Sequence, residues 1–361
     1  MGPDQFVILV DRVSHTEDAE LACDRLVEAL AAPLQLDRDW TIVPAASFGM
    51  VVLDGSQEAD EALMDAVTAM ERAKSQGGGG RRWFERSMLA DRATRHHVER
   101  ALRRAVEERD VILCYQPIVD LRYDQVVGFE ALVRIAGQDG SVISPDQFIP
   151  LAEATGLIHQ LGSCVIDAAL DQLAAWTLTD PARPTWVSIN CSPVELAAES
   201  YPGELAKALA RSGVPADRVT LEITESALLD HDGQTKTRLN GLHSLGVRLA
   251  LDDFGSGYSN LGYLSNLPFD KLKIDRAFIS GLDTNLNQRA IVQAVIDMAD
   301  AVGMHAVAEG VETTGEAELL RRMRCPLGQG YRYGRPLTPE DATALLNTCS
   351  VRLGRQHRDA A

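Results

Sequence analysis

The chain alternates between short apolar runs and amphipathic segments along most of its length. After residue 90, eight apolar runs rich in β-branched residues are separated, in most places, by segments with the 3.6-residue periodicity of helices. The predicted strands are VILCYQPIV, QVVGFEALVRI, TWVSIN, RVTLEIT, VRLALDD, KLKID, HAVAEGV and PLGQGY. Eight strands with interposed helices predict an α/β fold of the TIM (β/α)8 barrel type, with a doubly wound open sheet as the competing topology.

The first two predicted strands are joined by only a few residues, DLRYD. A parallel crossover needs a dozen residues or more, so these two strands should be antiparallel. We therefore expect a modified barrel that is irregular at its first strand.

The N-terminal region has a different pattern. QFVILVD predicts a short buried strand, and TIVPAASFGMVVLD predicts one or two strands. Helices are predicted over TEDAELACDRLVEALAAP, from Thr16 to near Pro33, and over ADEALMDAVTAMERAKSQ. The resulting order, β-α-β-β-α, is that of a partial α+β region.

A glycine-rich segment, SQGGGGRRWFERSM, covers residues 75–88 and cannot continue the preceding helix. The charged amphipathic helix DRATRHHVERALRRAVEERD follows it. We therefore predict one domain over residues 1–85 and a second over residues 86–361.

Polar side chains interrupt the strands of the second region near their ends. The clearest example is GFEALVRI, where the charged residues Glu130 and Arg134 lie in a run that is otherwise typical of a core strand. The polar positions at or after the strands are Glu130, Asn190, Glu222, Glu225, Asp252, Asp253, Lys273, Asp275, Glu309 and Gln329. The carboxyl ends of parallel barrel strands meet at one face, where active sites form, so these groups are expected to converge there.

Buried carboxylates are costly unless they are paired, hydrogen-bonded or bound to a metal. The candidate ligands carry only oxygen donors, which suits Mg²⁺ or Mn²⁺ better than Zn²⁺. The adjacent Asp252 and Asp253 point in different directions on an extended chain, so they could serve two ions. Two such ions are the usual arrangement for phosphodiester displacement, and Lys273 would add a fixed positive charge.

Composition narrows the possible partners. The formal net charge is −17, which disfavours polynucleotides and anionic membrane surfaces as partners. The six cysteines are scattered, the start lacks a signal peptide, and no apolar run approaches the length of a membrane span. These features predict a soluble, cytoplasmic protein.

Eight ordered segments carry a resemblance to a known family. YQPIVDL, GFEALVRI, SINCSPVEL, LEITES, LDDFGSGYSNLGYL, FDKLKIDRAFI, VAEGVET and GQGYRYGRPL resemble the successive motifs of EAL-domain phosphodiesterases, over about residues 91–346. The departures are mild: Ser256, Asn260, Cys191 and Ile135 stand where threonine, serine, an aliphatic residue and tryptophan are common. None of them removes a ligand.

The resemblance implies hydrolysis of cyclic di-GMP to linear pGpG with Mg²⁺ or Mn²⁺, two ions being expected, and a homodimer formed through the barrel. It implies that Lys273 and Glu309 orient or activate water, and that Glu225 anchors the DDFGSGYSN loop. The implied metal ligands are Glu130, Asn190, Glu222, Asp252 and Asp253. The implied substrate contacts are Gln116, Leu132, Arg134, Asp275, Gln329 and Pro336.

The first region resembles the C-terminal half of a GGDEF domain. GPDQF stands in place of the signature, with Pro3 replacing a glycine and Gln5 an acidic residue, and the half that contacts GTP is missing. The resemblance therefore implies a truncated, degenerate domain without diguanylate cyclase activity.

Two other functions remain open from the sequence. One is a non-enzymatic receptor for cyclic di-GMP, although such family members usually lack a metal-site carboxylate and this chain lacks none. The other, inferred without the family resemblance, is a Schiff-base aldolase with Lys273 as its nucleophile. An aldolase of this kind would leave the five oxygen ligands unexplained.

Overall fold

A computed structural model describes most of the chain. The described residues are 5–10, 16–30, 34–37, 40–42, 44, 46–53, 57–75, 80–85, 87–137, 139–180, 185–228, 234–255 and 266–356. The chain divides into two compact units, residues 1–97 and 98–361. Helix α3 (Ser87–Glu107) contains the boundary between them.

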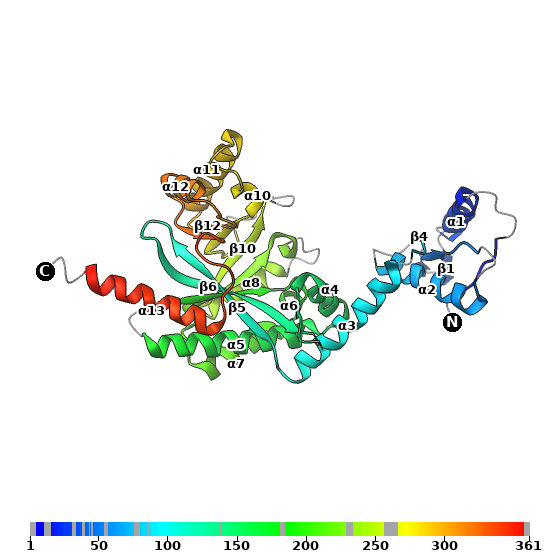
Figure 1. The fold of residues 1–361 in the computed structure, drawn as a ribbon, viewed down its shortest axis with the longest axis horizontal. Coiled ribbons are helices and arrows are strands. Elements are labelled where there is room, and N and C mark those ends of the chain that lie inside the picture. The colour runs from blue at the N-terminus through cyan, green and yellow to red at the C-terminus, as the bar shows by residue number, and fades with distance from the viewer. Residues whose placement is uncertain are drawn as a thin grey trace. The chain divides into compact units, whose positions relative to one another are not determined.

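The larger unit is a closed barrel of eight strands surrounded by helices (Figure 1). Its strands are β5 (Ile112–Asp120), β6 (Gln125–Ala136), β8 (Trp186–Cys191), β9 (Val219–Thr224), β10 (Arg248–Phe254), β11 (Lys271–Ile274), β12 (His305–Ala308) and β13 (Leu327–Gln329). The order around the barrel is β5-β13-β12-β11-β10-β9-β8-β6, and β6 pairs with β5 to close it. Closure rules out the open sheet, and all eight predicted strands are confirmed.

The barrel is mixed because β5 runs antiparallel to both of its neighbours, β6 and β13. The remaining neighbours are parallel. The short connection that predicted an antiparallel start therefore does produce one. A further two-residue strand, β7 (Val142–Ile143), pairs antiparallel with the C-terminal end of β6.

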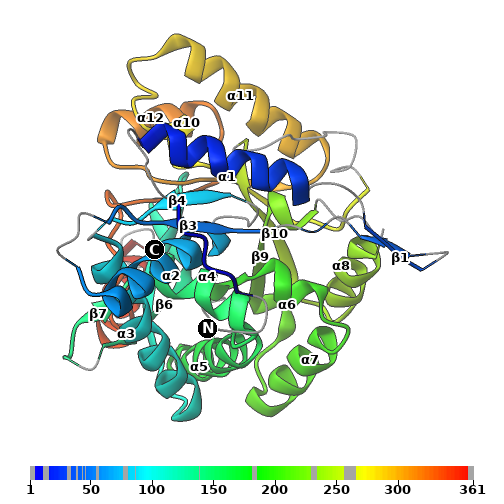
Figure 2. The ribbon, with the colours of Figure 1, turned by 90° about the vertical axis from the view of Figure 1, so that its right-hand side faces the viewer.

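Helices pack on the outside of the barrel, and α7 and α8 lie outside its strands in Figure 2. Their bounds are α4 (Pro145–Thr155), α5 (Ile158–Thr179), α6 (Pro193–Ala197), α7 (Tyr201–Ser212), α8 (Thr235–Ser244), α10 (Arg276–Ile279), α11 (Leu286–Ala301), α12 (Thr314–Arg322) and α13 (Pro339–Gln356). Two short 3₁₀ helices, η1 (Ala216–Arg218) and η2 (Glu225–Leu228), flank β9. No helix in the described residues is apolar over a length that could span a membrane.

The core fills the space between the strands and these helices. Tyr115, Phe129 and Trp176 form an aromatic cluster in it, with the Tyr115 and Trp176 rings 5.0 Å apart and edge to face. The Trp176 indole donates to the Thr343 hydroxyl at 2.8 Å, so its one polar group is satisfied. This cluster fixes α5 and α13 against β5 and β6, which carry two of the site residues described below.

The smaller unit has the elements α1 (Thr16–Leu30), β1 (Leu34–Asp37), β2 (Trp40–Ile42), β3 (Phe48–Met50), α2 (Ala59–Ser75) and β4 (Arg81–Trp83). Both predicted helices are present. Strands β3 and β4 pair in parallel, although β4 falls in a segment expected to be a linker. A Cβ at Gly49 would lie 1.9 Å from the Ala66 carbonyl oxygen, so glycine allows α2 to approach β3 closely.

The expectation of a buried strand in QFVILVD is wrong. Residues 5–10 have no strand pairing, and Phe6 and Leu9 are 86% and 76% exposed. The apolar run alone predicted burial, but a strand is buried only when a partner surface covers it, and the described part of this unit supplies none for these side chains.

A capping box stabilises the turn after β8. Ser192 caps α6, and the Glu195 carboxylate accepts from the Ser192 amide at 3.0 Å. Glu195 is 4% exposed, and a Cβ at Gly162 of α5 would lie 1.7 Å from its Oε1. Burial raises the pKa of Glu195 to about 7, although the hydrogen bond from the Ser192 amide opposes this effect. Repulsion from Glu153 and Glu204 raises the pKa further.

Glu195→Gln is expected to change how stability depends on pH. The raised pKa means that folded Glu195 keeps a proton that the unfolded chain releases above about pH 4.5, so its stabilisation is lost as the pH rises to about 7. The free energy of unfolding of the variant, relative to wild type, should therefore increase from pH 5 to pH 8 in urea titrations. Glu199→Gln, at an exposed position after α6, is the control, and identical profiles for Glu195→Gln and wild type would contradict the expectation.

Candidate active site

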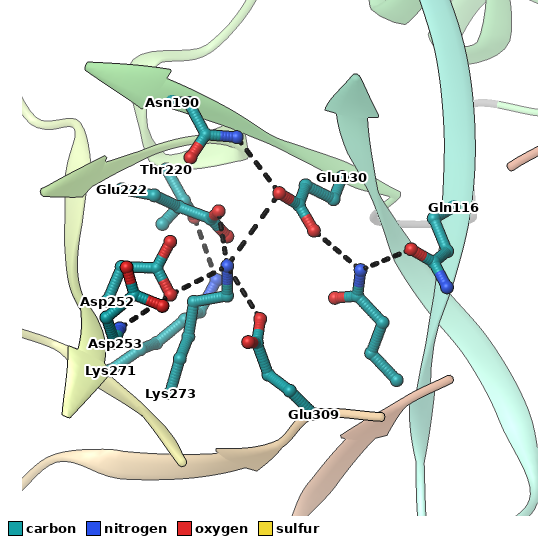
Figure 3. Close-up of polar contacts among 11 residues, drawn as sticks. Gln116, Glu130, Asn190, Thr220, Glu222, Asp252, Asp253, Lys271, Lys273 and Glu309 are labelled. Carbon is teal, nitrogen blue, oxygen red and sulfur yellow. Dashed lines mark hydrogen bonds and ion pairs between the residues drawn. The ribbon is translucent and has the colours of Figure 1, made fainter. Parts of the chain in front are cut away.

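Polar side chains from six neighbouring strands converge at one end of the barrel (Figure 3). Glu130 lies on β6, Asn190 on β8, Glu222 on β9, Asp252 and Asp253 on β10, and Lys273 on β11, while Glu309 directly follows β12. Glu130, Glu222, Asp252 and Lys273 are buried, whereas Asn190 and Asp253 are exposed at the end of the barrel. The structure thus brings together most of the groups that the strand-end pattern predicted, while Glu225 and Asp275 accept hydrogen bonds from backbone amides instead.

The Lys273 ammonium lies at the centre of this cluster. Its Nζ donates to Glu222 at 2.6 Å and pairs with Glu309 at 2.8 Å and with Asp252 at 3.1 Å. The Glu130 carboxylate lies 3.8 Å away. Lys273 and Glu222 are each 2% exposed, so bulk water does not screen these charges.

The cluster carries more negative charge than one ammonium can neutralise. Burial alone would lower the pKa of Lys273, but the surrounding carboxylates outweigh it and raise that pKa well above its ordinary value. Burial and repulsion from Glu130 raise the pKa of Glu222 well above normal, in spite of the nearby ammonium. The site therefore has capacity for a further cation. A firmly protonated Lys273 is also a poor Schiff-base nucleophile, which counts against the aldolase alternative.

Two amides bracket the Glu130 carboxylate. Asn190 Nδ2 donates to Oε1 at 2.9 Å, and Gln329 Nε2 donates to Oε2 at 2.6 Å. Burial opposes ionisation of Glu130, but Lys273 and these two donors outweigh it and lower its pKa. Glu130 is therefore held as a carboxylate with an amide hydrogen bond on each oxygen.

A bulge in β10 presents the two aspartates. The β10–β11 register shifts between Leu251 and Phe254, and Asp253 has a φ of 56°, a left-handed conformation that is unusual for a residue other than glycine. The Asp253 amide donates to Asp252 Oδ1 at 2.9 Å. Burial and the neighbouring Asp252 raise the pKa of Asp253. Strain of this kind is typical of functional sites, and it breaks the simple alternation that the sequence pattern assumed.

Glu225 lies in η2 and accepts a hydrogen bond from the Gly255 amide at 3.3 Å. Gly255 has a φ of 98° and is the last described residue at the start of the predicted DDFGSGYSN loop. The rest of that loop, with Ser256 and Asn260, lies outside the described residues.

The implied substrate positions have varied surroundings. Gln116 accepts from Gln329 at 3.0 Å, so both glutamines belong to the Glu130 hydrogen-bond network. Arg134 donates to the Val133 carbonyl of its own strand, and Asp275 caps α10 by accepting from the Ala277 amide. Leu132, on β6, and Pro336, just before the bridge between Leu337 and Tyr115, are both half-buried.

A second buried lysine was not predicted. Lys271 lies below the cluster, with Nζ 3.1 Å from the Trp186 ring centroid and 2.8 Å from the Thr220 hydroxyl. Burial lowers its pKa to about 7. The sequence could have predicted its position, because residues two apart share one face of a strand and Lys273 was already expected at the active-site end of the barrel.

The donor chemistry fits a hard divalent cation, since the cluster offers carboxylate and amide oxygens and an excess of negative charge. Within the described residues, however, no three histidine, cysteine, aspartate or glutamate side chains are arranged to hold one ion. The ammonium of Lys273 engages Glu222, Asp252 and Glu309 directly. An ion would have to draw some of these oxygens away from it.

Comparison with known proteins places this site in a family. A sequence profile described as EAL domain matches residues 99–336. The chain belongs to the EAL domain family. The matched residues include every side chain of the carboxylate cluster, and the family resemblance inferred from the sequence motifs is confirmed.

Two relatives of this EAL domain have names that refer to cyclic di-GMP. The chain is 36% identical over 346 residues to the bifunctional diguanylate cyclase/cyclic di-GMP phosphodiesterase MucR of Pseudomonas aeruginosa, covering 95% of this chain and 50% of MucR. It is 38% identical over 336 residues to the cyclic di-GMP phosphodiesterase NbdA of the same organism, covering 92% of this chain and 42% of NbdA. The chain thus spans about half the length, or less, of these relatives.

The fold has a close structural counterpart. The solved structure of the PaMucR phosphodiesterase in complex with c-di-GMP has a TM-score of 0.64 and 37% sequence identity to this chain. The match covers 68% of this chain and 99% of the other. It supports assignment of the larger unit to the EAL-type mixed barrel.

Lys273→Met is expected to destabilise the EAL domain strongly. Removing the ammonium leaves buried carboxylates facing one another, which typically costs about 3–5 kcal/mol in free energy of unfolding. The loss should be larger at pH 8 than at pH 5, because protonation relieves the repulsion. Urea titrations measure the free energy of unfolding, with Lys207→Met on the exposed face of α7 as the control. An unchanged free energy of unfolding of Lys273→Met at pH 8 would count against the cluster as described.

Proposed function

We propose that this EAL domain hydrolyses cyclic di-GMP to linear pGpG in a reaction that requires Mg²⁺ or Mn²⁺. The observation that carries the proposal is the convergence of four carboxylates on one buried ammonium, with negative charge in excess. Relatives that carry a phosphodiesterase name, and the structure of one in complex with c-di-GMP, support the substrate.

Two cations are expected, and the residues that would hold them all carry side-chain oxygen atoms at the end of the barrel. They are Glu130, Asn190, Glu222, Asp252 and Asp253. Asn190 donates its amide nitrogen to Glu130, which leaves its carbonyl oxygen as the donor atom for an ion. When bound, the cations would lower the pKa of the attacking water and offset charge on the phosphoryl oxygens.

Lys273 and Glu309 would supply the proton chemistry. Burial raises the pKa of Glu309 to about 7, against the opposing effect of Lys273, so its carboxylate can accept a proton from water near neutral pH. The Lys273 ammonium, 2.8 Å away, would hold Glu309 in place and add positive charge beside the phosphate. Glu225 would order the loop that follows β10, through the Gly255 amide.

Other residues would recognise the dinucleotide. The proposed contacts are Gln116, Leu132, Arg134, Asp275 and Pro336, whereas Gln329, which the resemblance also implied as a contact, is hydrogen-bonded to Glu130. A homodimer formed through the barrel also stays a prediction.

We also propose that residues 1–85 form a partial, degenerate GGDEF-like domain without cyclase activity, ahead of an EAL region over 86–361. The alignment with the bifunctional MucR supports this, since it extends over 95% of this chain and so reaches well beyond the barrel. Pro3 and Gln5 of the altered signature lie in the segment that would contact nucleotide, and Pro3 lies outside the described residues.

The direct test is a time course of cyclic di-GMP with the purified chain and Mg²⁺ or Mn²⁺, followed by chromatography. Linear pGpG should accumulate, and chelation with EDTA should stop the reaction. Tight binding measured by calorimetry, with no turnover under either ion, would favour the non-enzymatic receptor instead.

Glu130→Ala and Asp252→Ala are each expected to abolish hydrolysis while leaving the fold intact. Loss of a metal ligand removes several kcal/mol of charge stabilisation, which corresponds to a rate decrease on the order of 10³-fold. Initial rates of pGpG formation measure it, with circular dichroism to check the fold. Turnover close to wild type in either variant would refute the ligand assignment.

The rate is expected to fall as the pH drops below about 7. The raised pKa of Glu309 means that acidification protonates it and removes the base, so kcat/KM should decrease about tenfold per pH unit on the acid side. Glu309→Gln should be nearly inactive, and its residual activity should not show this decrease of kcat/KM at acid pH. A flat profile in the wild type between pH 5.5 and 8 would argue against Glu309 as the base.

A further inference from the structure

Gln329 ends β13 and is 4% exposed, at the edge of the carboxylate cluster. Its amide nitrogen has two protons, and both are used: one bond goes to Glu130 Oε2 at 2.6 Å and one to Gln116 Oε1 at 3.0 Å. The orientation of the amide is dictated by Glu130, because a carboxylate only accepts hydrogen bonds. The Gln329 side chain is therefore committed to Glu130 and to Gln116, with no donor left for a nucleotide.

The Gln329 carbonyl oxygen, Oε1, is buried and has no hydrogen-bond partner among the described residues. A buried acceptor without a donor is unfavourable, and packing alone would be served better by an apolar side chain. The amide nitrogen makes two hydrogen bonds that an apolar residue could not make.

The backbone around Gln329 is firmly placed. The Val311 amide donates to the Gln329 carbonyl at 3.0 Å, and the Arg332 amide donates to the Val311 carbonyl at 3.1 Å. A Cβ at Gly330 would lie 2.2 Å from the Val311 carbonyl oxygen, so glycine lets the two segments touch. Val311 is two residues after Glu309, so Gln329 is anchored to the segment that bears the proposed base.

We propose that Gln329 is a positioning residue that acts through Glu130: its amide fixes the Glu130 carboxylate for metal binding, and it does not contact the substrate. Asn190 holds the other Glu130 oxygen, so the two amides lock the carboxylate rotamer from both sides. Partners that orient a ligand in this way typically change metal affinity by 10–100-fold when they are removed. This inference rests on the proposed metal-dependent function.

The test is Mn²⁺ binding to the purified full chain without nucleotide, followed by electron paramagnetic resonance of the free ion. Gln329→Met, similar in size but unable to donate, is expected to raise the Kd for Mn²⁺ by about 10–100-fold. Gln116→Met is the matched control: it removes a glutamine of the same network that is hydrogen-bonded to Gln329 and not to Glu130, and a smaller rise is expected. Steady-state rates should separate the roles further, with kcat of Gln329→Met recovering at saturating Mn²⁺ and KM for the dinucleotide unchanged.

A wild-type Kd for Mn²⁺ in Gln329→Met, together with a raised KM, would overturn the inference and make Gln329 a substrate contact. If Gln329→Met does not fold, Gln329→Asn serves instead: its shorter side chain cannot reach Glu130, and the same rise in Kd is expected, with a wild-type value again overturning the inference. Failure of the wild-type chain itself to bind Mn²⁺ is a distinct outcome, because it would reject the proposed metal-dependent function as well.

Discussion

The structure of the site depends on one buried charge imbalance. A single ammonium, that of Lys273, faces carboxylates from β6, β9, β10 and the end of β12, all screened from bulk water. Attraction to the ammonium holds the carboxylates together, while burial and their mutual repulsion raise the pKa of Glu222, and the excess negative charge favours a divalent cation. The same arrangement thus stabilises the barrel end without a metal and favours binding of one.

The barrel supplies the rigidity that this imbalance requires. Closure between β5 and β6 places Gln116 directly opposite Glu130, and pairing of β13 with β5 brings Gln329 to the same carboxylate. The reversed direction of β5 is therefore part of how the site is assembled. Around the outside, the capping box at Ser192 and Glu195 fixes the turn that follows Asn190.

Several features were predictable because they depend on local pattern. The eight strands, the antiparallel first pair and the convergence of strand-end carboxylates all follow from hydrophobic periodicity, connection length and the geometry of parallel strands. Lys271 could have been predicted from its two-residue spacing to Lys273. The exposed run at Phe6–Val10 shows where the same reasoning fails, since periodicity indicates a strand without showing what covers it.

The sequence by itself determined the strand order along the chain, the chemical type of the ligands and, through eight ordered motifs, the EAL family. Only the tertiary structure decided which groups touch. It placed the Lys273 ammonium among the carboxylates, hydrogen-bonded Gln329 to both Glu130 and Gln116, and put Asp253 in a left-handed conformation at a bulge. The reason is that periodicity specifies the face on which a side chain lies, whereas pairwise distances arise from strand register and barrel closure, which bring Gln329 to Gln116 across 213 positions of the chain.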